Sequence, residues 1–80
     1  MDAITEEPRL KPGKYRHYSG KEYEVIGLVC HSETLQWHVL YKPLYEHQGM
    51  PDLWVRPYDM FIEEVTVNGD VTRRFTPVDT

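Results

Sequence analysis

The fold class of this chain rests on one stretch, YEVIGLVC at residues 23–30, which is its most apolar part. Its β-branched side chains, Val25, Ile26 and Val29, favour an extended strand. Gly27 in the middle argues against a buried helix and is typical of a bulge or bend. We therefore predict a strand that bends near Gly27, as a small curled sheet requires.

Further β-rich runs lie on both sides of this strand, separated by turn-forming residues. Asn68-Gly69-Asp70 stands between two of them and predicts a hairpin, because Asn and Gly tolerate the positive φ of a tight turn. Pro57 before Tyr58–Phe61 predicts a single helical turn. The runs expected to form strands, besides residues 23–30, are Lys14–Tyr18, Gln36–Tyr41, Leu53–Val55, Ile62–Val67 and Val71–Phe75.

The expected architecture is a mostly β domain of five or six short strands with one helical turn. A small SH3-like barrel is the best match, and an OB-like barrel is the alternative. OB-like barrels usually carry a longer helix between strands, for which the spacing leaves no room. Alternation along Gln36–Tyr41 places Trp37, Val39 and Tyr41 on one face. The predicted core consists of Trp37, Val39, Val25, Leu28, Val55, Met60 and Phe61.

Eighty residues make one small domain with a modest core. We expect a flexible arm over residues 1–11, a single domain over 12–76 and a short tail over 77–80. Cys30 is the only cysteine, which excludes an internal disulfide, and its apolar surroundings favour an inert buried thiol. The first residues lack the pattern of a signal peptide, and no apolar run approaches the ~18 residues that span a membrane. The cytosol is therefore the expected compartment, with no membrane partner.

The net charge of −4 conceals an uneven distribution. Residues 9–21 carry five Lys or Arg and no acid, whereas residues 22–80 carry ten acids and four Lys or Arg. A solvated edge strand whose charges discourage pairing explains the basic segment most simply. The alternative is a small anion-binding face. Nonspecific binding to duplex nucleic acid is not expected, because it needs a larger basic surface.

No cofactor or metal is expected from the sequence. It contains no phosphate-binding loop and no residues spaced as a nucleophile–base pair. The four histidines, at positions 17, 31, 38 and 47, lack the close repeated spacing of metal ligands. Ser32 beside His31 does not predict a catalytic dyad, because neighbouring side chains on a strand point to opposite faces.

Short motifs follow one another in a recognisable order over most of residues 12–67. The blocks are GKYRHY with Gly20 at 13–20, YEV at 23–25, HSETL at 31–35, Val39 with Tyr41, Leu44 with Tyr45, LWVRP at 53–57 and MF at 60–61. In these blocks the chain resembles a family of short, mostly bacterial domains of unknown function, numbered 1653. It departs from that pattern at Cys30, where a basic or polar residue is expected, and in a slightly longer loop at Gly49–Asp52. The resemblance implies one recurring structural unit and no particular activity.

Two segments concentrate interaction-capable side chains where strands are expected to end, His31-Ser32-Glu33-Thr34 and Leu53–Pro57. Ser, Glu and Thr can lock a tight turn through backbone N–H groups, so a purely structural turn explains the first segment equally well. Arg56 lies between Val55 and a proline in an apolar stretch and needs a carboxylate partner there. The predicted partner is Glu33, or another acid within the same pocket, in a two-bond pairing that serves either as a strut between loops or as part of a ligand site.

The expected function is a binding or interaction domain that recognises a small anionic ligand, a nucleotide or a peptide. Two or three of its many aromatic rings are expected to line a surface groove. Two alternatives stay open: a small hydrolase-like enzyme with His31 as base, oriented by Glu33, and a purely structural accessory domain. The oligomeric state is left open. The predicted binding face consists of Arg16, His17, Tyr18, His31, Ser32, Glu33, Thr34, Trp54 and Arg56.

Overall fold

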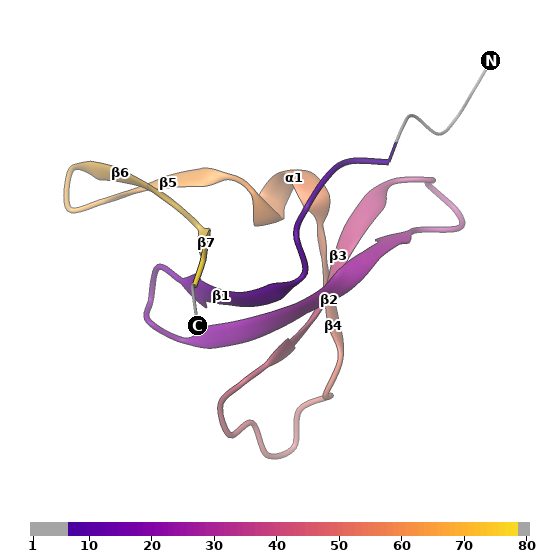
Figure 1. Ribbon diagram of the computed structural model, residues 1–80, viewed down its shortest axis with the longest axis horizontal. Helices are drawn as coiled ribbons and strands as arrows, with labels where there is room; N and C mark the ends of the chain where they lie inside the picture. Colours follow the sequence, from indigo (N-terminus) through magenta and orange to yellow (C-terminus); the bar gives the residue numbers. More distant parts are fainter. Residues whose placement is uncertain (1–6, 79–80) are drawn as a thin grey trace.

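A computed structural model describes residues 7–78 of the chain, and its elements are mostly short strands (Figure 1). Each predicted strand is present within a few residues of its expected bounds, except that the last one is divided, and α1 covers the predicted helical turn. Residues 1–6 of the expected arm and 79–80 of the expected tail lie outside the described residues. The elements are β1 (Gly13–His17), β2 (Glu22–Cys30), β3 (Trp37–Pro43), β4 (Trp54–Pro57), α1 (Tyr58–Phe61), β5 (Glu64–Val67), β6 (Asp70–Arg73) and β7 (Phe75–Pro77).

Five of the strands form one antiparallel sheet in the order β4-β3-β2-β1-β7, and β5 and β6 form a separate antiparallel hairpin. Figure 1 shows this hairpin projecting to one side, away from the long β2–β3 pair. The mostly β class is therefore confirmed. The SH3-like barrel is not confirmed, nor is the OB-like alternative, because the strands of residues 7–78 do not close into one barrel.

The basic strand β1 lies inside the sheet, between β2 and β7, so the predicted edge position is wrong. The chain leaves β6 at Arg74 and crosses to β1, where His17 pairs with Phe75. Arg74 supports this crossing with its backbone: its N–H donates to the Glu63 carbonyl at 2.8 Å, and its carbonyl accepts from the Tyr18 N–H at 3.0 Å. Two strands, β6 and β7, thus replace the single predicted strand Val71–Phe75, and β7 pairs with β1 in the sheet.

Two local predictions about backbone geometry are confirmed. The β2–β3 register shifts between Val25 and Gly27, which leaves Ile26 as the extra residue of a bulge. In the β5–β6 turn, Asn68 has φ 53° and Gly69 has φ 85°. Positive φ at both central residues is the geometry of a type I′ hairpin turn. Both features depend on residues next to each other in the sequence, and the sequence alone predicts them.

The hydrophobic core agrees with the prediction at three of its seven positions. Val25, Val39 and Phe61 are each no more than 1% exposed. Leu28 is half-buried and packs against the core, and Trp37 is half-buried. The fully buried set is strongly aromatic, with four large rings beside Phe61 and the two valines. It consists of Tyr15, Tyr23, Val25, Val39, Tyr41, Phe61 and Phe75.

Val55 and Met60 were expected in the core, but they are 55% and 44% exposed. In the β3–β4 register, Val55 pairs with Leu40 on the outer face of the sheet. The inner positions of β4 belong to its neighbours, Trp54 and Arg56. In α1, the inward position is taken by Phe61, so Met60 faces outward. The prediction failed because alternation along so short a strand does not tell which of its faces is buried.

Contacts of aromatic side chains connect the sheet, α1 and the segment just before β1. Phe61 of α1 stacks on Phe75 of β7, with centroids 4.0 Å apart, and Tyr15 meets Phe61 edge to face at 5.6 Å. The hydroxyl of Tyr15 donates to the Lys11 carbonyl at 2.7 Å.

No helix within residues 7–78 is long and apolar enough to cross a membrane.

Candidate functional site

Arg56 lies on the inner face of the sheet, not among solvated loops. In the register of β4 it pairs with Val39, which has no exposed surface. Its Nε–H donates to the Tyr41 hydroxyl at 3.3 Å, and its guanidinium carbon lies 5.5 Å from the centroid of the Phe75 ring. Within residues 7–78 no carboxylate lies within 4.0 Å of it. The predicted pairing with Glu33 is therefore wrong.

His17 reaches the same region from β1. Its ring meets Phe75 edge to face at 4.9 Å and lies 4.4 Å from the ring of Tyr18. Its Nδ1 accepts the backbone N–H of Ser19 at 3.1 Å, with the Ser19 hydroxyl 2.8 Å away. Because Nδ1 accepts a hydrogen bond there, the neutral ring carries its own proton on Nε2.

Positive charge gathers around His17. Burial lowers the pKa of the imidazole first, and nearby cations lower it further. These cations are Arg56, Arg74 and Lys21, which come from three different parts of the fold. Arg74 is paired with Glu63 at 2.9 Å, whereas Lys21 has no carboxylate within 4.0 Å among residues 7–78.

Three tyrosines lie between Lys21 and Arg56. The Lys21 ammonium is 4.7 Å from the centroid of the Tyr45 ring, and the Tyr45 and Tyr23 hydroxyls are 3.1 Å apart. Burial, with the Tyr45 hydrogen bond second, raises the pKa of Tyr23, so it stays a neutral hydroxyl at any ordinary pH. The Tyr23 ring in turn meets the Tyr41 ring edge to face at 5.4 Å.

Trp54 completes this group from β4. Its ring centroid is 6.1 Å from those of both Tyr23 and Tyr41, and its indole N–H donates to the Pro51 carbonyl at 2.7 Å. That bond holds the indole in place beside the tyrosines. We refer to the whole group as the cationic–aromatic face, which consists of His17, Lys21, Tyr23, Tyr41, Tyr45, Trp54, Arg56 and Phe75.

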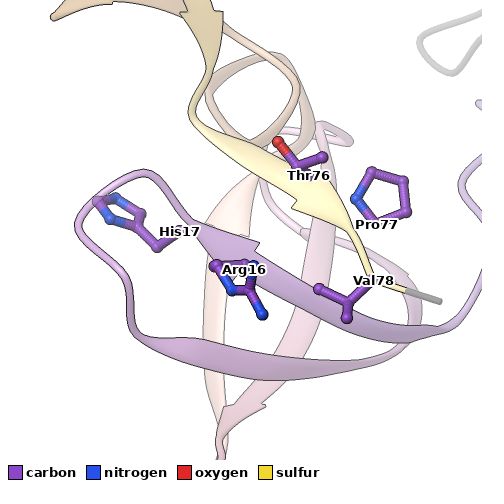
Figure 2. A pocket seen from close by; sticks show the side chains of 5 residues that line it. All are labelled: Arg16, His17, Thr76, Pro77 and Val78. Atoms are coloured by element: carbon purple, nitrogen blue, oxygen red, sulfur yellow. The ribbon is translucent and has the colours of Figure 1, made fainter. Parts of the chain in front are cut away.

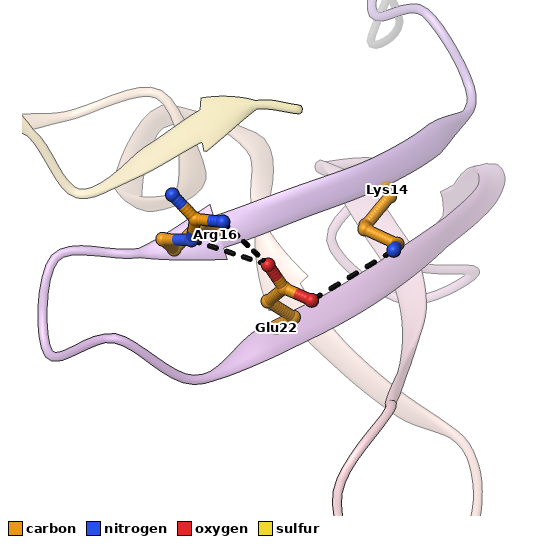
Figure 3. Close-up of polar contacts among 3 residues, drawn as sticks. All are labelled: Lys14, Arg16 and Glu22. Atoms are coloured by element: carbon orange, nitrogen blue, oxygen red, sulfur yellow. Dashed lines mark hydrogen bonds and ion pairs between the residues drawn. The ribbon is translucent and has the colours of Figure 1, made fainter. Parts of the chain in front are cut away.

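Arg16 lies on the opposite, outer face of β1 and belongs to a different set of contacts (Figure 3). Its Nη2 and Nε both approach one oxygen of Glu22, at 2.7 and 3.2 Å, and Lys14 lies 3.8 Å from the other oxygen. The Arg16 hydrogen bond, more than any other effect, lowers the pKa of Glu22. Two of the five cations of the basic segment are therefore already compensated.

A shallow hollow of about 420 Å³ lies over the β1–β7 pair (Figure 2). Arg16 and Thr76 pair across the two strands there. Figure 2 shows the Arg16 and His17 side chains pointing in different directions from neighbouring positions of β1. The hollow is open, and its one guanidinium is the one that binds Glu22. It is therefore a weaker candidate than the cationic–aromatic face.

The turn His31–Thr34 lies at the far end of β2 and uses its polar groups internally. The Nδ1 of His31 accepts the backbone N–H groups of Glu33 and Thr34, at 3.1 and 3.2 Å. The Thr34 hydroxyl accepts the Gln36 N–H at 3.2 Å. These bonds close the turn, as the structural interpretation requires. The bond from Glu33 comes from its backbone and not its carboxylate, so the predicted orientation of the His31 base by that carboxylate is wrong.

The structure divides the nine predicted site residues into separate groups. His17, Trp54 and Arg56 come together on the cationic–aromatic face, and Tyr18 packs against His17. Arg16 lies on the outer face of the sheet. The turn at residues 31–34 is separated from His17 by the length of β2, nine residues, or about 30 Å. The prediction that all nine residues share one face is therefore wrong, whereas ligand binding by the individual residues stays a prediction.

Sequence reasoning missed most of the groups that surround Arg56. Tyr41 had a usable signal, since alternation placed it beside Val39, but the register of β4 against β3 was not readable. Lys21 is one of five cations in residues 9–21, and nothing in the sequence distinguishes it from the other four. The other missed residues are Tyr23, Tyr45, Arg74 and Phe75, and the neighbours of each come from distant strands.

The remaining histidines and the cysteine lie in other parts of the described chain. The rings of His31 and His38 are 5.7 Å apart, but residues 7–78 contain no group of three His, Cys, Asp or Glu side chains placed to hold a metal ion. Cys30 is a half-buried free thiol, 3.7 Å from the His31 carbonyl. In the β3–β4 loop, His47 bonds the Tyr45 carbonyl through Nδ1 at 2.7 Å and the Asp52 carboxylate through Nε2 at 3.0 Å.

Comparisons with known proteins agree with the resemblance seen in the sequence blocks. The family described as "Protein of unknown function (DUF1653)" matches residues 13–77. A crystal structure of a DUF1653 protein from Bordetella bronchiseptica is 35% identical and superposes with a TM-score of 0.80, covering 86% of this chain and 87% of that one. No curated protein matches the chain. The match over nearly the whole domain shows that the chain belongs to the DUF1653 family.

Proposed function

We propose that this domain binds a small anionic ligand on the cationic–aromatic face, with Arg56 as the main anchor. One observation supports the proposal. The half-buried guanidinium of Arg56 lies on the inner face of the sheet and bonds a tyrosine hydroxyl, and it has no carboxylate partner within residues 7–78. A guanidinium has five N–H donors, and the Tyr41 hydroxyl occupies one. Planar, two-bond recognition of a carboxylate or phosphate is what such a group does best.

The surroundings of Arg56 support an anion more than a cation or an apolar ligand. Lys21 adds a second positive charge that has no carboxylate within 4.0 Å among residues 7–78, and the neutral His17 adds an Nε2–H donor. The chain as a whole has a net charge of −4, so this concentration of cations is local. A local positive potential attracts small anions even to an acidic protein.

Thermal unfolding with added oxyanions tests the proposal. Sulfate, phosphate, citrate and adenosine monophosphate would be compared at constant ionic strength. An anion present at ten times its Kd stabilises the folded form by about 1.4 kcal/mol, which raises the Tm of a domain this small by roughly 6–11 °C. We expect at least one of these anions to do so.

Two matched variants locate the site. Arg56→Met removes the guanidinium of the inner face and should abolish the shift. Arg16→Met removes the same charge from the outer face, where Glu22 holds it, and should leave the shift intact. Equal loss in both variants would mean a general charge effect. A shift unchanged in Arg56→Met would refute the proposed anchor, and the absence of any shift would favour the structural accessory domain.

For this binding domain we also propose a cytosolic location. Cys30 is the chain's one cysteine and is a free, half-buried thiol. Free thiols persist in reducing compartments, whereas small secreted domains commonly use disulfides. Fractionation of cells that produce the tagged protein checks this, and recovery in the secreted fraction would contradict it.

A further inference from the structure

The β3–β4 loop, residues 44–53, lies at the lower end of the β3–β4 pair in Figure 1. The half-buried side chain of His47 connects its two halves. Nδ1 of the imidazole lies 2.7 Å from the Tyr45 carbonyl oxygen, and Nε2 lies 3.0 Å from a carboxylate oxygen of Asp52. A carbonyl and an ionised carboxylate only accept hydrogen bonds, so both ring nitrogens have to donate. Only the protonated imidazolium has two N–H groups, and this loop geometry therefore requires it.

We infer that His47 is a pH-sensitive latch, which holds the β3–β4 loop closed when it is protonated and releases one side when it is neutral. The neutral ring has a single N–H. The shorter bond, to the Tyr45 carbonyl, keeps that proton on Nδ1. The lone pair of Nε2 then faces the Asp52 carboxylate, and two acceptors do not bond each other. Loss of the proton therefore opens the Asp52 side of the loop.

The charged and titratable groups around His47 come from its own loop and from the β1–β2 turn. The Tyr45 ring is 6.2 Å from the imidazole, and Lys21 lies over the far-reaching Tyr45 ring from the turn. Glu46 precedes His47 and lines the same shallow hollow of the loop. Among residues 7–78, Asp52 is the one carboxylate within 4.0 Å of His47. The bonds to the Tyr45 carbonyl and then to Asp52 raise the pKa of His47, so the latch opens as the pH rises above 6.5.

Two further hydrogen bonds report whether the loop is closed. The Met50 N–H donates to the His47 carbonyl at 3.0 Å, across the tip of the loop. The Trp54 indole N–H donates to the carbonyl of Pro51, the residue before Asp52, at 2.7 Å. Opening of the Asp52 side should loosen both bonds. This inference does not depend on the proposed function, since it concerns the loop alone.

Hydrogen exchange of the full chain, followed by NMR, tests the latch. The Met50 amide and the Trp54 indole N–H would be measured between about pH 5.5 and pH 8.5, on either side of the ordinary histidine pKa. Exchange would be expressed as a protection factor, which corrects for the faster intrinsic exchange at high pH. Protection in the wild type should fall by about three-fold as the pH rises, within the range expected for loss of an exposed ion pair.

Variants connect this fall to His47 and Asp52. An Asn side chain can accept from the protonated ring and donate to the neutral one, so Asp52→Asn should reduce the change to less than about 1.5-fold. His47→Gln removes the titration and should do the same. Asp59→Asn is the matched control, because Asp59 is an exposed acid of α1 with no ion-pair partner within residues 7–78. It should retain the full fall.

The outcomes decide between a latch and a passive contact. Protection that does not change with pH in the wild type would overturn the inference. An equal fall in wild type and Asp52→Asn would overturn it too, because the change would then come from the other histidines. A fall that Asp52→Asn and His47→Gln remove, and Asp59→Asn does not, supports the latch. Amide NMR spectra establish that each variant is folded.

Discussion

The two turns at the ends of β2 begin in the same way and finish in different surroundings. One turn starts at His17 and the other follows His31, and Figure 1 shows them at opposite ends of the long strand. In each, Nδ1 of the histidine accepts the backbone N–H of the residue two positions later, Ser19 or Glu33, at 3.1 Å in both cases. The two turns therefore share this hydrogen bond, although Nδ1 of His31 also accepts the Thr34 N–H and Nδ1 of His17 lies beside the Ser19 hydroxyl.

The two turns differ in which strands lie close to them. β7 brings Phe75 against His17, and β4 and the β6–β7 crossing bring two arginines near it. His31 has the ring of His38, from the adjacent strand, at 5.7 Å and is otherwise exposed. A turn motif read from sequence is thus a weak guide to function, because the distant strands packed against it set its charge and burial.

The largest effect on this comparison is expected from removing Phe75, the buried ring that packs against the His17 turn and not against the His31 turn. Phe75→Ala should destabilise the domain by about 3–5 kcal/mol, because it empties a buried site that stacks on Phe61. Urea unfolding followed by fluorescence measures the loss. The control, Val71→Ala, changes a side chain that is 66% exposed and should stay within about 0.5 kcal/mol of wild type. Similar losses in both variants would contradict the aromatic core.

A second test concerns the tyrosine pair beside the His17 turn. The hydroxyls of Tyr23 and Tyr45 are 3.1 Å apart. Tyr23→Phe and Tyr45→Phe, combined in a double-mutant cycle, should give a coupling free energy of about 0.5–1.5 kcal/mol. Chemical unfolding of the four proteins provides the values. Strict additivity would mean that the two hydroxyls prefer water to each other.

At the other end of β2, the His31 bonds can be removed without touching the core. His31→Ala deletes the acceptor of two backbone N–H groups in an exposed turn, so a loss of about 0.5–1 kcal/mol is expected. His31→Asn should lose less, because an Asn side chain can accept from the N–H two residues on. Thermal unfolding distinguishes the two. If Ala and Asn behave alike, the Nδ1 bonds do not hold the turn.

The smallest effect expected is a pH dependence at His17. Its pKa is lowered from the ordinary value of 6.5, mainly by burial. The unfolded chain therefore binds a proton at a pH where the folded chain does not. The contribution of His17 to stability is complete above pH 6.5 and is lost as the pH falls through the folded pKa. Unfolding of wild type and His17→Gln across this range should show a shallower acid-side decline in the variant.

His47 in the β3–β4 loop should contribute a pH dependence of stability that is opposite in sign to that of His17, so the two histidines can be compared in one experiment. Its bond to the Tyr45 carbonyl, followed by its contact with Asp52, raises its pKa above 6.5. Its stabilising contribution is therefore complete below pH 6.5 and is lost as the pH rises through the folded pKa. NMR titration of the imidazole protons should place His47 above His17. Asp52→Asn should lower the pKa of His47 and leave that of His17 unchanged.

Arg56 illustrates how far the candidate site could be predicted. The sequence indicates correctly that an arginine in an apolar stretch is unusual and needs a polar partner. It suggests Glu33 as that partner and Val55 as the buried neighbour, and both are wrong. The partner is the Tyr41 hydroxyl, because the pairing of β4 with β3 turns Arg56 inward and Val55 outward. An alternating pattern over the four residues of β4 is compatible with either face of the strand pointing inward.

The sequence by itself determined the features that depend on neighbouring residues. These are the mostly β class, the bulge at Gly27, the Asn68-Gly69 turn and the helical turn after Pro57, each of which follows from local backbone preferences. Only the tertiary structure decided that the sheet stays open, that β7 covers β1 and that two cations flank a row of tyrosines. Those features depend on strand order and register, which are set by contacts between residues far apart in the chain.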